Sequence, residues 1–121
     1  MIQGIKHVTV PVRDQARALS FYTQKLGFIV TTDAPMGPGQ RWIELKLPDS
    51  STYLVLFTAP GQEDRIGTPS NIIFTCPDVR KTHAQLAAQG VSFTQPPTEE
   101  PWGTYALFED SEGNTFCLSA S

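Results

Sequence analysis

The amino-terminal stretch IKHVTVPVRDQARALSFYTQKLGF, residues 5–28, contains the pattern of a strand, then of a helix, then the start of a second strand. Residues 5–12 alternate and are rich in β-branched side chains, which is typical of a strand. Asp14 is a good N-cap residue, residues 15–26 repeat apolar side chains at helical spacing, and Gly27 is a stop signal. The stretch therefore predicts a strand followed by an amphipathic helix of about three turns.

Three more strands are predicted in the first half of the chain, at residues 28–32, 42–47 and 53–57. The intervening residues 33–40 hold two prolines and two glycines and are predicted to be a loop. The segment 33–41 has two possible roles. It is either a lid, on which Arg41 could hold an anionic group, or a plain surface loop. The first half thus has the predicted order β-α-β-β-β.

The second half repeats this order. Its predicted elements are a strand at 71–76, a helix from Pro77-Asp78 to Gly90, strands at 91–94, 104–109 and 115–119, and a proline-rich loop at 95–103. His7 matches Asn71, 64 residues later, and the apolar run 53–56 matches 115–118, 62 residues later. About sixty residues with one helix bury too little to be stable alone, so the halves must share a core or pair with another subunit. We predict one domain, 1–121, made of two repeats, approximately 1–58 and 70–121.

Composition argues against several classes of partner. Hydrophobic residues make up 40% of the chain and charged residues 17%, with nine basic and twelve acidic side chains and a net charge of −3. Without a run of Lys or Arg, neither a nucleic acid nor a membrane surface is an expected partner. No apolar run approaches the roughly 20 residues of a spanning helix and no leader pattern is present, so a cytoplasmic location is expected, with Cys76 and Cys117 as free thiols.

Three motifs carry a family resemblance. They are IKHV at 5–8, SFY at 20–22 with LGF at 26–28, and FEDSEGN at 108–114. Together with the duplicated order of elements, they resemble the vicinal oxygen chelate superfamily of glyoxalases, bleomycin-resistance proteins and extradiol dioxygenases, over essentially the whole chain. The resemblance implies an α+β fold in which two βαβββ modules form a curved eight-stranded mixed sheet with a cup-shaped cleft, and it implies a homodimer.

The resemblance also places the metal ligands of metal-dependent relatives at His7, Val55, Asn71 and Cys117. A Lewis-acid metal needs three or four His, Glu or equivalent ligands with open positions for substrate. Only His7 is a good ligand, because Val55 cannot coordinate, Asn71 offers a weak amide oxygen and Cys117 offers a soft thiolate only when ionised. We therefore expect no metal and no other cofactor, with His7 the best candidate if a metal binds, and no carboxylate base is evident.

The expected function is binding of a small organic molecule, of aromatic type, by residues that line the cup. The candidate ligand-binding residues are His7, Trp42, Tyr53, Val55, Asn71, Trp102, Tyr105 and Cys117, with Phe57 and Phe108 on or beside the same strands. Trp102 lies in the loop 96–103, where rim contact and plain packing are equally expected.

Other side chains have simpler expected roles. Phe21, Tyr22 and Phe28 are predicted core residues, and the acidic side chains of the turn 109–112 are predicted to be solvated. Two alternative functions stay open: a metal-dependent lyase or dioxygenase of the same superfamily that uses His7 as a ligand, and a module that serves only as an interaction surface. Whether the protein is an enzyme is left open.

Overall fold

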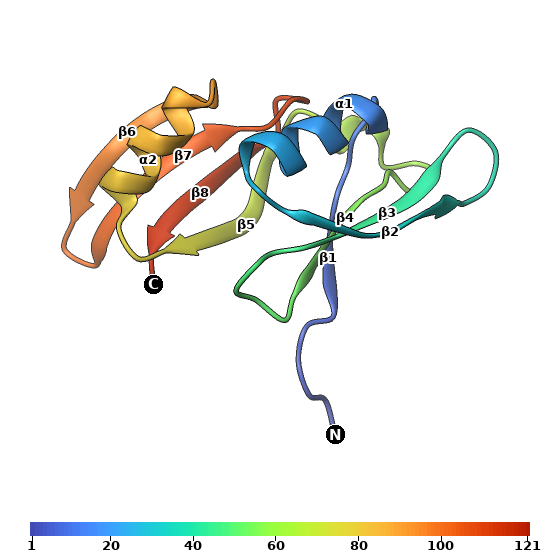
Figure 1. Ribbon diagram of the computed structural model, residues 1–121, viewed down its shortest axis with the longest axis horizontal. Coiled ribbons are helices and arrows are strands. Elements are labelled where there is room, and N and C mark those ends of the chain that lie inside the picture. The colour runs from blue at the N-terminus through green and yellow to red at the C-terminus, as the bar shows by residue number, and fades with distance from the viewer. The chain divides into compact units, whose positions relative to one another are not determined.

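The computed structural model describes residues 1–121, which divide into two units, Met1–Ile66 and Gly67–Ser121. Each unit is one βαβββ module (Figure 1), so the predicted duplication is confirmed. The first unit contains β1 (His7–Val10), α1 (Gln15–Ser20), the π-helical segment η1 (Phe21–Lys25), β2 (Ile29–Pro35), β3 (Arg41–Lys46), β4 (Tyr53–Leu56) and the 3₁₀ segment η2 (Glu63–Arg65). The second contains β5 (Pro69–Cys76), α2 (Val79–Ala88), β6 (Ser92–Glu100), β7 (Gly103–Glu109) and β8 (Thr115–Ala120).

Each unit forms its own four-stranded mixed sheet. The strand order is β1-β4-β3-β2 in the first and β5-β8-β7-β6 in the second. In both sheets the first strand of the module pairs in parallel with the last, and the other pairs are antiparallel. This confirms the α+β fold built from two equivalent modules.

The strand registers reproduce the offsets of the sequence repeat. Thr9 lies opposite Val55 in the first sheet, and Ile73 lies opposite Cys117 in the second. Thr9 and Ile73 are 64 positions apart, whereas Val55 and Cys117 are 62 positions apart. Residues matched by the repeat therefore occupy the same places in their sheets.

Aspartate side chains begin both helices, as predicted. Asp14 accepts a hydrogen bond from the backbone N–H of Arg17 at 3.0 Å, and Asp78 accepts one from Lys81 at 3.1 Å. Such caps satisfy backbone donors that have no partner within the helix. No helix in the structure has both the length and the apolar character needed to span a membrane.

The first helix changes its hydrogen-bonding pattern after Ser20. Residues up to Ser20 are α-helical, whereas η1 is one turn of π-helix, from which Leu26 donates to the carbonyl of Phe21. Phe21 and Tyr22 in this turn are buried, and Tyr22 lies against Phe28 with ring centroids 5.9 Å apart. The prediction that these three aromatics pack in the core is confirmed.

One face of each sheet is the buried one. In the first sheet this face carries Val10, Ile43, Leu45, Leu54 and Leu56, and α1 packs on β4. In the second sheet it carries mainly Phe74, Phe93, Ala106, Phe108, Phe116 and Leu118, and α2 contacts β6, β7 and β8. Phe108 lies on the same strand as Tyr105, as predicted, but alternation along β7 turns its side chain toward the core.

The predicted loop at 33–40 is shorter in the structure. β2 continues through Asp33 to Pro35, which pairs with β3, and only residues 36–40 connect the two strands. Pro35 is tolerated because β2 is an edge strand, where a missing N–H removes no hydrogen bond of the ladder. The segment for which a lid or a plain surface loop was expected is therefore a tight hairpin, closed by a 3.0 Å hydrogen bond from the N–H of Met36 to the carbonyl of Gln40.

The predicted loop at 95–103 is also largely strand. β6 runs through Pro96 and Pro97 to Glu100 at the edge of the second sheet. Its register with β7 shifts between Phe93 and Gln95 and again before Thr98. Bulges on an edge strand accommodate proline, which explains how this segment pairs despite its composition.

The turn between β7 and β8 is built around a buried carboxylate. Asp110 is 7% exposed, and its oxygens accept hydrogen bonds from the backbone of Glu112 (2.8 Å) and from both the backbone (3.0 Å) and the side chain (2.9 Å) of Asn114. Asn114 in turn accepts a 2.8 Å hydrogen bond from the N–H of Gly67. The expectation of a solvated acidic turn is thus wrong for Asp110, which holds the turn to the start of the second unit.

Candidate functional site

The face of the first sheet opposite the buried row carries the predicted ligand-binding residues of this unit. His7 lies opposite Tyr53, and Val55 lies between Thr9 on β1 and Glu44 on β3. Side chains on paired positions point to the same side of a sheet and alternate along each strand. We call this the aromatic face and define it as His7, Trp42, Glu44, Tyr53, Val55 and Phe57.

Three rings form a row across the aromatic face. The indole of Trp42 lies 5.5 Å from the imidazole of His7, edge to face, and 5.3 Å from the ring of Phe57. Because β4 lies between β1 and β3, the contact between His7 and Trp42 passes over β4, and Val55 beneath it is 0% exposed. Val55 is therefore the floor under the rings.

The imidazole of His7 has one nitrogen without a partner. Its Nδ1 is buried, and no group of the chain forms a hydrogen bond with it. A buried polar atom without a partner costs about 1–3 kcal/mol, so this nitrogen favours any bound group that can pair with it.

Glu44 is a site residue that our sequence reasoning missed. The carboxylate is half-buried, accepts a long 3.4 Å hydrogen bond from Nε1 of Trp42, and forms no ion pair. A carboxylate therefore lies on the same face as His7, although no carboxylate base was evident from the sequence. The signal was present in the strand pattern, because Glu44 is two residues from Trp42 and must share its face.

The matching face of the second sheet holds Tyr105 and Cys117, with Trp102 beside them. The rings of Trp102 and Tyr105 are stacked, with centroids 5.3 Å apart and an interplanar angle of 28°. The phenol oxygen of Tyr105 accepts a 2.7 Å hydrogen bond from Gln95, which fixes the lower ring of the stack. Trp102 is 65% exposed, so it is not a residue buried by loop packing.

Asn71 and Cys117 lie on this same face of the second sheet. Asn71 is exposed, at a point where the pairing of β5 with β8 is irregular. Cys117 is half-buried opposite Ile73, and burial raises the pKa of its thiol above the usual value. Cys117 and the buried Cys76 form no disulfide, as predicted.

The four positions that would hold a metal in metal-dependent relatives do not supply a suitable donor set. Val55 has no donor atom, the raised pKa keeps Cys117 as a thiol at neutral pH, and Asn71 is a neutral amide. Neither unit brings together three side chains of His, Cys, Asp or Glu in a group that could hold a metal ion. Only His7 fits the role of a ligand, and one such residue is too few to hold a catalytic metal.

The fold of two βαβββ modules and a match to a family model together define the class of this protein. Residues 4–118 match the family model described as the Glyoxalase/Bleomycin resistance protein/Dioxygenase superfamily. The chain belongs to this superfamily, which confirms the resemblance seen in its motifs.

Individual relatives resemble this chain over nearly its whole length. Protein YetH of Bacillus subtilis (strain 168) is 36% identical over 118 residues, which is 98% of each chain. The crystal structure of a superfamily member from Sphaerobacter thermophilus DSM 20745 has a TM-score of 0.89 and 30% identity and covers 99% of this chain and 98% of its own. TnmS3, an antibiotic binding protein from Streptomyces sp. CB03234, has a TM-score of 0.84 and 30% identity, with 98% and 96% covered.

Proposed function

We propose that this protein binds a small aromatic molecule, such as an antibiotic, by stacking and hydrogen bonding rather than by chelation to a metal. The observation that carries the proposal is the ring row of His7, Trp42 and Phe57 above the floor of Val55. Flat aromatic ligands gain both buried apolar area and favourable ring geometry on such a surface. The similarity to TnmS3, an antibiotic binding protein, supports the same class of ligand.

Two polar groups would orient the ligand on the aromatic face. The buried Nδ1 of His7 has no partner, and the carboxylate of Glu44 has only a long hydrogen bond to Trp42. A few polar groups within an apolar surface are what give small-molecule sites their specificity. A ligand that carries an N–H or O–H group beside its ring can donate to Glu44 while the ring lies on Trp42.

Further contacts are proposed from the second unit. The stacked pair Trp102 and Tyr105 presents an exposed aromatic surface, and Asn71 and Cys117 add small polar groups on the same sheet. These residues are our proposed ligand contacts on the second unit, and Tyr53 is a proposed contact on the aromatic face of the first. We also propose a cytoplasmic homodimer without a resident metal or other cofactor, which rests on the family resemblance, the charge and cysteine pattern and the donor set above.

Binding can be measured by titrating aromatic antibiotics and following intrinsic tryptophan fluorescence and the shift of the unfolding temperature. A molecule that binds only the folded state must raise that temperature. For a compound that binds, Trp42→Leu and His7→Ala should each weaken affinity by about tenfold or more, since each removes a ring of the row.

The matched control is His83→Ala. His83 lies on α2 of the second unit with its ring 4.5 Å from Phe93, on the buried side of that sheet, and it is not a residue of the aromatic face, so this variant should bind as the wild type does. Equal binding by wild type and His7→Ala would contradict the proposal. Stoichiometric metal in the purified protein, with binding lost on chelation, would favour the metal-dependent lyase or dioxygenase instead.

A further inference from the structure

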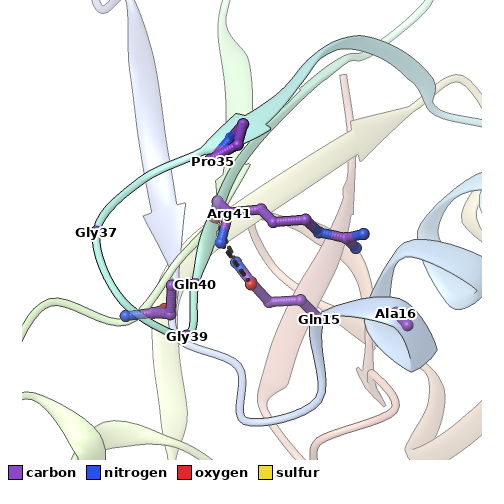
Figure 2. A pocket seen from close by; sticks show the side chains of 7 residues that line it. All are labelled: Gln15, Ala16, Pro35, Gly37, Gly39, Gln40 and Arg41. Atoms are coloured by element: carbon purple, nitrogen blue, oxygen red, sulfur yellow. Dashed lines mark hydrogen bonds between the residues drawn. The ribbon is translucent and has the colours of Figure 1, made fainter.

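The first unit holds a cavity on the other side of its sheet from the aromatic face. Its volume is about 450 Å³, and its walls come from the start of α1 and from the hairpin between β2 and β3 (Figure 2). The lining residues are Gln15, Ala16, Pro35, Gly37, Gly39, Gln40 and Arg41. Because Arg41 precedes Trp42 on β3, alternation places Arg41 on the opposite face.

Gln15 holds the backbone of Arg41 in place. Its Oε1 accepts from the N–H of Arg41 at 2.9 Å, and its Nε2 donates to the carbonyl oxygens of Arg41 at 2.6 Å and Leu56 at 2.9 Å. The carboxamide of Gln40 pairs in the same way with the backbone of Thr58, at 2.8 and 3.0 Å. The carboxamides of Gln15 and Gln40 thus pair with backbone N–H and C=O groups as a neighbouring strand would, and these hydrogen bonds fix the cavity wall.

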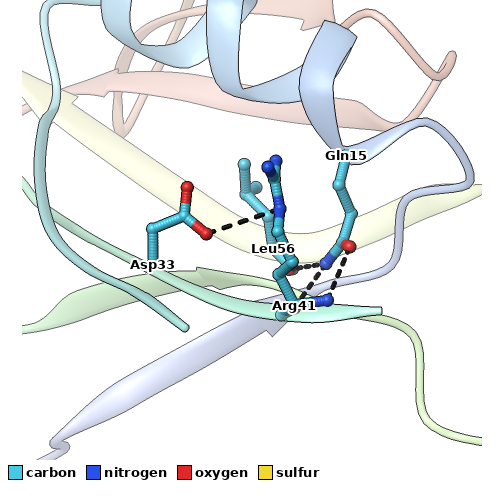
Figure 3. Close-up of polar contacts among 4 residues, drawn as sticks. All are labelled: Gln15, Asp33, Arg41 and Leu56. Carbon is cyan, nitrogen blue, oxygen red and sulfur yellow. Dashed lines mark hydrogen bonds and ion pairs between the residues drawn. The ribbon is translucent and has the colours of Figure 1, made fainter. Parts of the chain in front are cut away.

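The guanidinium of Arg41 is oriented by one ion pair, made through its Nε. Its Nε lies 3.4 Å from Oδ1 of Asp33 (Figure 3), and the two side chains are 43% and 32% exposed. The chain offers no partner to the two terminal nitrogens, Nη1 and Nη2. Figure 2 shows the Arg41 side chain extended across the cavity toward α1. A guanidinium with a free end can bind a carboxylate through two parallel hydrogen bonds.

We propose that this cavity binds the carboxylate of a small organic acid on the two terminal nitrogens of Arg41. Asp33 already offsets part of the arginine charge, so the site suits one added negative charge better than the two of a phosphate dianion. Ala16 and Pro35 provide an apolar wall for the hydrocarbon part of the acid. This site is separate from the aromatic face and does not depend on the function proposed for it.

The test uses benzoate, with benzyl alcohol as its neutral analogue and inorganic phosphate as a second anion. Nuclear magnetic resonance can follow the amides of Gly37 and Gly39 and the Nε–H of Arg41 during each titration. Benzoate should produce saturable shifts of these signals, benzyl alcohol should produce none, and phosphate should bind more weakly. Shifts that fail to saturate with benzoate, or phosphate binding as tight as that of benzoate, would overturn the proposal.

Two variants of Arg41 and one matched control make the assignment specific. Arg41→Gln should weaken benzoate binding about fivefold or more, and Arg41→Lys should also weaken it, because lysine keeps the charge but lacks the fork. Arg80 is the control, since its guanidinium also lies 3.4 Å from a carboxylate, that of Glu99, but on the open surface of the second unit. Arg80→Gln should bind benzoate as the wild type does. An equal loss in Arg80→Gln, or full affinity in a folded Arg41→Lys, would refute the site.

Discussion

Nε1 of Trp42 donates a hydrogen bond to Oε1 of Glu44, two residues further along the same strand, at 3.4 Å. The pair lies on the aromatic face, where Trp42 also touches the rings of His7 and Phe57. A single polar contact thus helps to set the orientation of the ring at the centre of the row.

Replacement of Glu44 by leucine should affect binding more than stability. The hydrogen bond is long and the site is half-buried, so its loss should lower the free energy of unfolding by less than about 1 kcal/mol. Affinity for an aromatic ligand with an N–H or O–H donor should fall about tenfold, because both the orientation of Trp42 and the acceptor are lost. Urea unfolding and fluorescence titration give the two quantities, and a larger effect on stability than on binding would contradict the assigned role.

Truncation of Val55 to alanine should damage both properties. Its side chain is fully buried under the ring row, and loss of two methyl groups from such a place costs about 2 kcal/mol. The rings of His7, Trp42 and Phe57 should then change their packing, and the aromatic face should bind ligand more weakly. Val91→Ala is the matched control, since Val91 is also buried but lies in the second unit before β6, and it should lower stability without changing affinity.

The thiol of Cys117 should react slowly at neutral pH. Burial raises its pKa, so less of the reactive thiolate is present than in a free cysteine. In a Cys76→Ser background, the rate of alkylation should rise with pH to a midpoint above about 8.5, the value of an unperturbed thiol. A midpoint at or below that of free cysteine, measured in parallel, would show that the thiol is activated instead.

The same pKa shift has a definite sign for stability. The folded state holds the thiol proton more tightly than the unfolded state, so the contribution of Cys117 is fully present below the unfolded pKa. It is then lost as the pH rises through the unfolded pKa toward the raised folded one. Two proteins should be compared by urea unfolding, the Cys76→Ser variant and the same variant with Cys117→Ser added. Above about pH 8.5, the variant that keeps Cys117 should lose stability relative to the other.

Asp110→Ala should be the most destabilising of these changes. It removes the acceptor of three hydrogen bonds in a buried turn, and bonds to a charged group are worth about 1.5–3 kcal/mol each, although not additively. We expect a loss of about 3 kcal/mol, measured by guanidinium unfolding, with Asp49→Ala as an exposed control of no more than about 0.5 kcal/mol. A loss as small as that of the control would mean that the turn does not need its carboxylate.

The predictions from sequence succeeded where local pattern and tertiary context agree. The caps at Asp14 and Asp78, the core positions of Phe21 and Tyr22 and the duplicated order of elements all follow from spacing alone. The prolines were misleading, because Pro35 and Pro96 lie in edge strands. Whether a strand is at an edge depends on sheet order, which no local pattern contains.

The aromatic face was predicted only in part, again because part of it depends on contacts between strands that are not adjacent in sequence. His7, Trp42, Tyr53 and Val55 were identified as candidates, but alternation along the strand was not applied to Glu44. Nor could sequence show that the row of rings would cover Val55, since that contact passes from β1 to β3 over the strand between them. The burial of Asp110 depends likewise on Gly67 and Asn114, which are far apart in sequence.

The prolines in β2 and β6 also affect the ability of these edge strands to pair with another chain. β2 and β6 each lie at one edge of a sheet, where an open row of backbone donors invites another chain to add a strand. Pro35 in β2 and Pro96 and Pro97 in β6 cannot donate, and the bulges of β6 break the regular spacing that an incoming strand would need. The residues that obscured these two strands in the sequence therefore hinder the addition of another chain's strand at the β2 and β6 edges.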